Sequence, residues 1–168
     1  MFRFTCACCG EVQDGVPSFA AAAPLHYESL TEDEQRERGR LSGEVCIIDD
    51  RLFFVRALLR IPVIGSEDPF VWNIWASLSA QSFEEYAAHY DDPARTDFGP
   101  YFCWLSAALP TYPSLDELRS SLHLQPIGQR PLIELAPSDH PLSLEQRQGI
   151  SAQRLGEIFA ACVHGAGG

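Results

Sequence analysis

Apolar and polar residues alternate along two neighbouring segments in the middle of the chain. In residues 52–61 one side of the alternation is wholly apolar: Phe53, Val55, Ala57, Leu59 and Ile61. In residues 70–78 the apolar side consists of Phe70, Trp72, Ile74, Ala76 and Leu78. This period of two predicts two β-strands, each with one buried face. Because only a short turn at residues 64–69 separates them, we expect an antiparallel hairpin.

Shorter apolar runs on both sides of this hairpin predict further strands. Residues 44–49 suit a strand that ends in a turn at Asp49, Asp50 and Arg51. Three later runs also suit strands: residues 101–107, 118–125 and 130–135. The alanine-rich residues 19–24 are expected to form a loop or a loose strand over the core.

Helical signals lie between these strands. Ser82 and Glu85 predict a capping box at the start of a helix. Its apolar residues recur at helical spacing: Phe83, Tyr86, Ala87 and Tyr90. Thr31 with Glu34 predicts an earlier helix, which lacks an apolar stripe and is therefore expected to be exposed.

Two more helices are expected to close the chain. Ser143 with Gln146 caps the first, and the second carries an apolar stripe of Leu155, Ile158, Phe159 and Cys162. Strands grouped mid-chain, with inserted and C-terminal helices, predict an α+β fold with a mainly antiparallel sheet. We expect one domain over residues 1–164 and a disordered tail over residues 165–168.

Charge and hydropathy limit the partners. The formal net charge of −11 argues against binding to nucleic acid or to an anionic membrane surface. It favours the approach of a basic or neutral partner, although it can also serve solubility alone. The first residues lack the apolar core of a signal peptide, and no run approaches a membrane span, so we expect a cytoplasmic protein with reduced thiols.

Three of the six cysteines lie close together near the start, in Phe4–Val12. Cys6 and Cys9 have the spacing that lets two thiolates reach one ion, and Gly10 allows a tight knuckle like that of a zinc ribbon. A structural zinc site needs two further ligands, and the second half of the motif is missing. Cys46 is the first candidate, with Cys8 as a spare in the knuckle, while the other cysteines and the five histidines stand singly.

Two other interpretations of the cysteine cluster remain. The residues can simply pack as small apolar side chains. A thioredoxin-like redox pair would lie between a strand and a long helix, which lowers the pKa of its first thiol. The residues after Cys9 suit a turn and a strand instead, and this context argues against redox chemistry.

A mixed sheet face carries the second candidate site. Arg56 and Arg60 are four apart on the strand at 52–61, and Trp75 lies on the strand at 70–78. Two arginines beside an aromatic ring suit a carboxylate or a phosphate. A solvated sheet face, with the arginines paired to acidic residues, explains the same pattern.

Familiar catalytic motifs are missing from the sequence. Asp139 beside His140 could orient a general base, but no nucleophile accompanies the pair, and a turn before a helix explains it better. The sequence has no Walker loop, no GxGxxG and no HExxH.

Several phrases together resemble one bacterial family. They are the CxxCG start, CIIDD with FFVR, IPVIGSEDPFVWNIWASLS, the YPS turn and GQRPLIELAPSDHPLSLEQRQGI. On these the chain resembles the bacterial domain of unknown function 2199 over nearly its whole length. The resemblance implies a bacterial, cytoplasmic, single-domain protein and no activity. In that family a histidine often stands four positions after the second knuckle cysteine, where this chain has Gln13.

Two functional hypotheses follow. The first is a non-catalytic cytoplasmic protein that binds another protein, with zinc bracing its N-terminus at Cys6, Cys9 and Cys46. The alternative is a small enzyme or anion binder that uses a pocket at Arg56, Arg60 and Trp75. A deep cleft at this face would favour the alternative, and a flat face would count against it.

Overall fold

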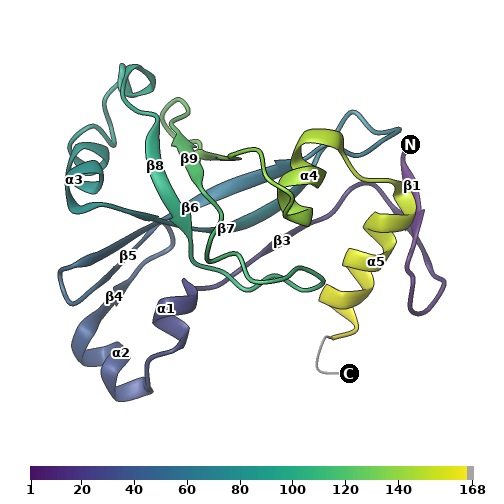
Figure 1. The fold of residues 1–168 in the computed structure, drawn as a ribbon, viewed down its shortest axis with the longest axis horizontal. Coiled ribbons are helices and arrows are strands. Elements are labelled where there is room, and N and C mark those ends of the chain that lie inside the picture. Colours follow the sequence, from purple (N-terminus) through teal and green to yellow (C-terminus); the bar gives the residue numbers. More distant parts are fainter. Residues whose placement is uncertain (166–168) are drawn as a thin grey trace.

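The structure is a computed structural model that describes residues 1–165 (Figure 1). Its centre is the hairpin of β6 (Leu52–Ile61) and β7 (Phe70–Leu78), which pair antiparallel from Phe53 opposite Leu78 to Ile61 opposite Phe70. The predicted hairpin and the α+β class are therefore confirmed. Apart from Gly165, the predicted tail at residues 165–168 lies outside the described residues.

The sheet closes on itself. β8 (Tyr101–Leu105) pairs with β7, β9 (Ser120–His123) with β8 and β10 (Leu132–Leu135) with β9, all antiparallel. β10 then pairs with β6 in parallel, and this completes a five-stranded barrel. The closure was not predicted. It arises because β6 and β7 are much longer than their neighbours, so different parts of each strand pair with different partners.

In the part of the chain that the structure describes, five short strands lie outside the barrel. β5 (Val45–Ile48) pairs antiparallel with β6, and β4 (Gly39–Leu41) with β5. β3 (Ser18–Ala20) lies parallel to β7 and overlaps the start of residues 19–24, which were expected to be a loop or a loose strand. β1 (Arg3–Thr5) and β2 (Val12–Asp14) form a separate hairpin. The sheet is mainly antiparallel, with β3–β7 and β10–β6 as its parallel pairs.

Apart from the half-buried Phe53, the two apolar faces predicted from alternation are buried in one main core. This core contains residues from all five barrel strands and from both closing helices. A second, smaller cluster lies on the other side of β6 and β7 and consists of Cys46, Ile48, Phe54 and Trp75. The mixed face is therefore partly buried, because Ala21, Tyr27 and Leu30 pack over it.

Within residues 1–165, six helical segments complete the fold. They are α1 (Leu25–Glu28), α2 (Glu32–Arg38), α3 (Ala80–Ala88), η1 (Arg95–Asp97), α4 (Pro141–Gln148) and α5 (Ala152–Val163). The capping box of Thr31 and Glu34 and the exposed character of α2 are confirmed. Among residues 1–165, none of the helices has the length and apolar character needed to cross a membrane.

Two predicted caps were wrong. The side chain of Ser79, and not that of Ser82, caps α3: it accepts from the backbone N–H of Ser82. The helix therefore begins three residues before the predicted start. His140 caps α4, and Ser143 is instead buried, donating to the carbonyl oxygen of Ala136. In both cases the capping residue itself has extended backbone angles, as an N-cap needs.

Candidate functional site

The cysteine knuckle is the turn of the β1–β2 hairpin. The N–H of Cys6 donates to the carbonyl oxygen of Glu11 at 2.9 Å, and the N–H of Gly10 donates to that of Cys6 at 3.0 Å. Gly10 has a φ of 76°, which strongly favours glycine. This tight turn brings Cys6 and Cys9 to the same side of the loop, as their spacing predicted.

Helix α5 packs directly on this hairpin. Phe4 contacts Phe159 edge to face at 5.3 Å, and the N–H of Ala7 donates to the carbonyl oxygen of Gly156 at 3.2 Å. A Cβ atom at Gly156 would overlap the carbonyl oxygen of Thr5, so only glycine allows this approach. The end of α5 is thereby held beside the knuckle.

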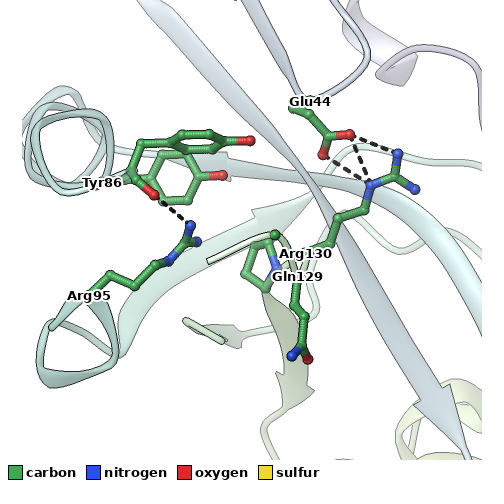
Figure 2. A pocket seen from close by; sticks show the side chains of 8 residues that line it. Glu44, Tyr86, Arg95, Gln129 and Arg130 are labelled. Atoms are coloured by element: carbon green, nitrogen blue, oxygen red, sulfur yellow. Dashed lines mark hydrogen bonds and ion pairs between the residues drawn. The ribbon is translucent and has the colours of Figure 1, made fainter. Parts of the chain in front are cut away.

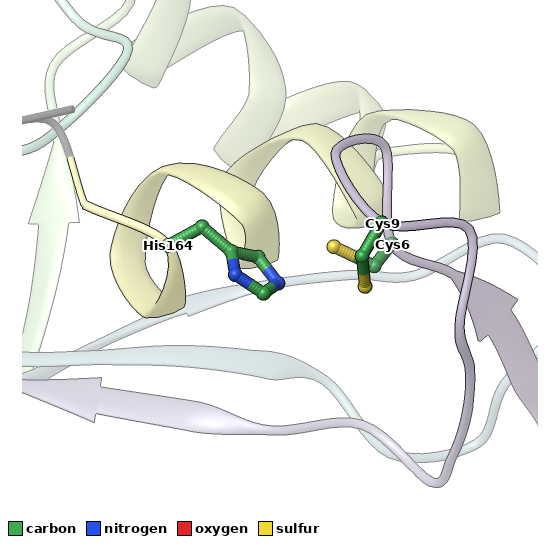
Figure 3. A group of neighbouring side chains, drawn as sticks. All are labelled: Cys6, Cys9 and His164. Carbon is green, nitrogen blue, oxygen red and sulfur yellow. The ribbon is translucent and has the colours of Figure 1, made fainter.

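This packing places a histidine opposite the two cysteines. Figure 3 shows His164, at the end of α5, beside Cys6 and Cys9 of the loop. One ligand atom from each residue lies within 4.8 Å of the other two. Around tetrahedral zinc such atoms would be about 3.5–3.8 Å apart, given Zn–S bonds of about 2.3 Å and Zn–N bonds of about 2.0–2.1 Å. A small closure of the loop on the helix would therefore suffice.

The backbone of the knuckle favours a thiolate. The pKa of the Cys6 thiol is lowered, chiefly by the backbone N–H of Cys9, with further help from the N–H of Cys8. Burial of Cys6 acts in the opposite direction. Hydrogen bonds to the charged form stabilise it, and the thiolate is the form of cysteine that binds metals.

The structure does not bring Cys46 to this group. Cys46 is fully buried in the second apolar cluster, beside Phe54 and Trp75. Burial raises the pKa of its thiol to about 11, which disfavours the metal-binding form. His164 occupies the place that the sequence analysis assigned first to Cys46, and Cys8 is exposed in the same loop.

The arginine face is arranged differently from a ligand site. Arg56 is buried and stacks over Trp75, with its guanidinium carbon 4.6 Å from the ring centroid. Its Nε donates to the carbonyl oxygen of Gly43 at 2.7 Å and its Nη2 to that of Ala22 at 3.2 Å. Trp75 is also buried, whereas Arg60 is exposed. Arg56 and Trp75 thus contact each other, and the donors of Arg56 bind the protein's own backbone.

His140 has the structural role that the sequence favoured. Its Nδ1 accepts from the N–H of Leu142 at 3.1 Å, and its Nε2 donates to the carbonyl oxygen of Ser114 at 3.0 Å. Both ring nitrogens are therefore engaged by backbone groups.

Comparison with known families agrees with the phrases noted in the sequence. The family model described as "Uncharacterized protein conserved in bacteria (DUF2199)" matches residues 5–150. The chain belongs to this family. The matched region includes the knuckle, the barrel and α4, and ends before α5. No curated protein and no solved structure matches the chain.

His164 is the site residue that the sequence analysis did not single out. It stands alone near the C-terminus, and its spacing to the cysteines follows no local motif. Only the docking of α5 on β1 brings it to the knuckle. The apolar stripe that begins at Leu155 predicted a packed helix, but it did not indicate which strand the helix would cover.

Proposed function

We propose that this chain is a non-catalytic, cytoplasmic binding protein whose two ends are joined by a structural zinc ion. Cys6 and Cys9 provide two thiolates and His164 one imidazole. The observation that carries the proposal is the approach of these three side chains to within 4.8 Å of one another, from opposite ends of the sequence. Cys8, exposed in the same loop, is available as a fourth ligand.

The donor set selects the metal. Thiolate and imidazole ligands favour zinc over hard cations such as magnesium or calcium, which take oxygen ligands. A zinc ion here would fasten α5 to the β1–β2 hairpin, and its binding free energy would add to that of folding.

An aromatic pair supports the binding role. Phe102 and Trp104 on β8 are 51% and 41% exposed, and their rings meet edge to face at 4.9 Å. Exposed aromatic side chains are enriched at protein interfaces. With a net charge of −11, the chain favours a protein partner with a basic surface.

Zinc content tests the metal site. Protein purified without a His-tag or chelator should contain about one zinc per chain, and Cys9→Ser or His164→Ala should release it and lower the melting temperature. His123→Ala, a histidine on β9, is the matched control and should retain zinc. Gly156→Ala alters no ligand but should also lower zinc content, because it displaces α5. Zinc-free protein, or His164→Ala with full zinc content, would contradict the proposal.

Capture from the native cytoplasm tests the binding role separately. The parent protein should retain a basic partner that the double variant Phe102→Ser, Trp104→Ser loses while keeping its fold and its zinc. Capture of no protein above background would count against a partner.

A further inference from the structure

A second site, unrelated to the cysteine knuckle, lies where α3 and η1 face the β9–β10 loop. A cavity of about 360 Å³ opens there, near the lower end of the range for small-ligand sites. Its charged and aromatic lining residues are Glu44, Tyr86, Tyr90, Arg95 and Arg130. Figure 2 shows Arg95 on one side of the cavity and the Glu44–Arg130 pair on the other.

Arg95 is the unusual member of this group. Arg95 is only 2% exposed, yet within residues 1–165 its guanidinium has one hydrogen bond of normal geometry, from Nη1 to the carbonyl oxygen of Tyr90 at 2.8 Å. The hydroxyl of Tyr86 is a second, weaker partner of the guanidinium. Its buried Nε has no hydrogen-bond partner in the described part of the chain. Buried guanidinium groups are normally paired with an anion, because an unpaired buried charge is costly.

The free edge of Arg95 has the geometry of an oxyanion site. Nε and Nη2 of arginine form a fork that holds two oxygens of one carboxylate or phosphate. Arg130 uses this same edge on Glu44, with distances of 3.0 Å from Nε and 2.8 Å from Nη2. Within the described residues, no carboxylate pairs with the corresponding edge of Arg95.

The surroundings of the cavity favour an anion. Two guanidinium groups and one carboxylate line it, so its lining is positive in a chain of net charge −11. The nearby carboxylate of Glu85 accepts from the hydroxyl of Tyr101 at 3.1 Å. The guanidinium of Arg95 lies near the faces of Tyr90 and Tyr86, 5.3 and 6.0 Å from their centroids, and these rings fix its position.

We propose that this cavity binds a small organic anion, whose carboxylate or phosphate group is held by the Nε–Nη2 edge of Arg95 and faces Arg130. The site differs from the arginine face predicted from the sequence, where Arg56 is occupied by backbone carbonyls. It also shares no residue with the cysteine group, so either proposal can fail alone.

Calorimetric titration with inorganic phosphate and, separately, with acetate tests the site. Binding of either anion, at constant ionic strength set with chloride, supports the proposal, and the preferred one identifies the chemical group. Arg95→Met should weaken binding about tenfold or more, because it removes charge-assisted hydrogen bonds. Arg60→Met, an exposed arginine on β6, is the matched control and should bind like the parent.

Arg95→Lys keeps the positive charge but lacks the two-pronged edge of the guanidinium, so it should also weaken anion binding. It replaces Arg95→Met in the test if Arg95→Met does not fold. Circular dichroism of each variant establishes its fold. The proposal is overturned if neither anion binds, if folded Arg95 variants bind like the parent, or if Arg60→Met loses as much affinity as they do.

Discussion

Two arginines are buried in the described part of the chain, and their hydrogen bonding is opposite. Arg56 is 9% exposed, and it has two carbonyl acceptors and an indole face. Arg95 is 2% exposed, and it has one carbonyl acceptor and an unpartnered Nε. The guanidinium of Arg56 donates to backbone carbonyls and so connects separate segments of the chain. The guanidinium of Arg95 is held in position by its neighbours, but its Nε has no acceptor and the side chain lines a cavity. Burial alone therefore does not distinguish a structural arginine from a binding one; the count of occupied donors does.

The largest expected effect concerns the ring beneath Arg56. Trp75→Ala should lower the free energy of unfolding by about 3–5 kcal/mol, because it opens a cavity in a fully buried cluster. Tyr90→Ala, the equivalent change beneath Arg95, should cost clearly less, since Tyr90 is 39% exposed. Urea denaturation measures both values, and equal losses would contradict the contrast.

Replacing the arginines themselves compares the two sites directly. Arg56→Met should destabilise the protein by about 2 kcal/mol or more, because two carbonyl oxygens lose their donor. Arg95→Met loses one hydrogen bond but also removes an unpaired buried charge, so its stability should stay within about 1 kcal/mol of the parent. If Arg95→Met unfolded at a lower urea concentration than Arg56→Met, the number of occupied donors would not distinguish the two arginines.

The hydrophobic pattern predicted the barrel hairpin and both apolar faces, since alternation reflects burial residue by residue. It also marked Arg56 and Trp75 as neighbours, and they do contact each other. It did not show that loop carbonyls from Gly43 and Ala22 would occupy Arg56, because these contacts depend on tertiary packing. Arg95 lies in a short 3-10 segment with no periodicity, and its burial arises from tyrosines on α3 and just beyond it.

A pH titration should sharpen the description of the Arg95 side. Burial, followed by the neighbouring Tyr90, raises the pKa of Tyr86 to about 12. The buried, protonated phenol of Tyr86 contributes its full stabilisation at pH values below about 10, which is the pKa of tyrosine in the unfolded chain. This stabilisation is lost as the pH rises from about 10 to 12, at up to about 1.4 kcal/mol per pH unit, because only the unfolded phenol ionises in that range. Tyr86→Phe should show a shallower loss in denaturation at alkaline pH, and an unchanged slope would argue against this burial.

The smallest expected change in the free energy of unfolding concerns the ion pair of Glu44 and Arg130, which lies across the cavity from Arg95. The side chains of Glu44 and Arg130 are 37% and 36% exposed, so Glu44→Gln should cost less than about 1 kcal/mol. The same change frees the guanidinium of Arg130 and should strengthen phosphate binding. Weaker phosphate binding in Glu44→Gln would mean that the ion pair shapes the cavity.

The most direct test observes both guanidinium groups in one sample. In a ¹H–¹⁵N spectrum of the arginine side chains, the Nε–H signals of Arg56 and Arg95 are assigned by Arg56→Met and Arg95→Met. On titration with phosphate, the signal of Arg95 should shift in proportion to occupancy, while that of Arg56, bound to Gly43 at 2.7 Å, should stay in place. A shift of Arg56 as large as that of Arg95, or no shift of Arg95, would contradict the distinction between the two arginines.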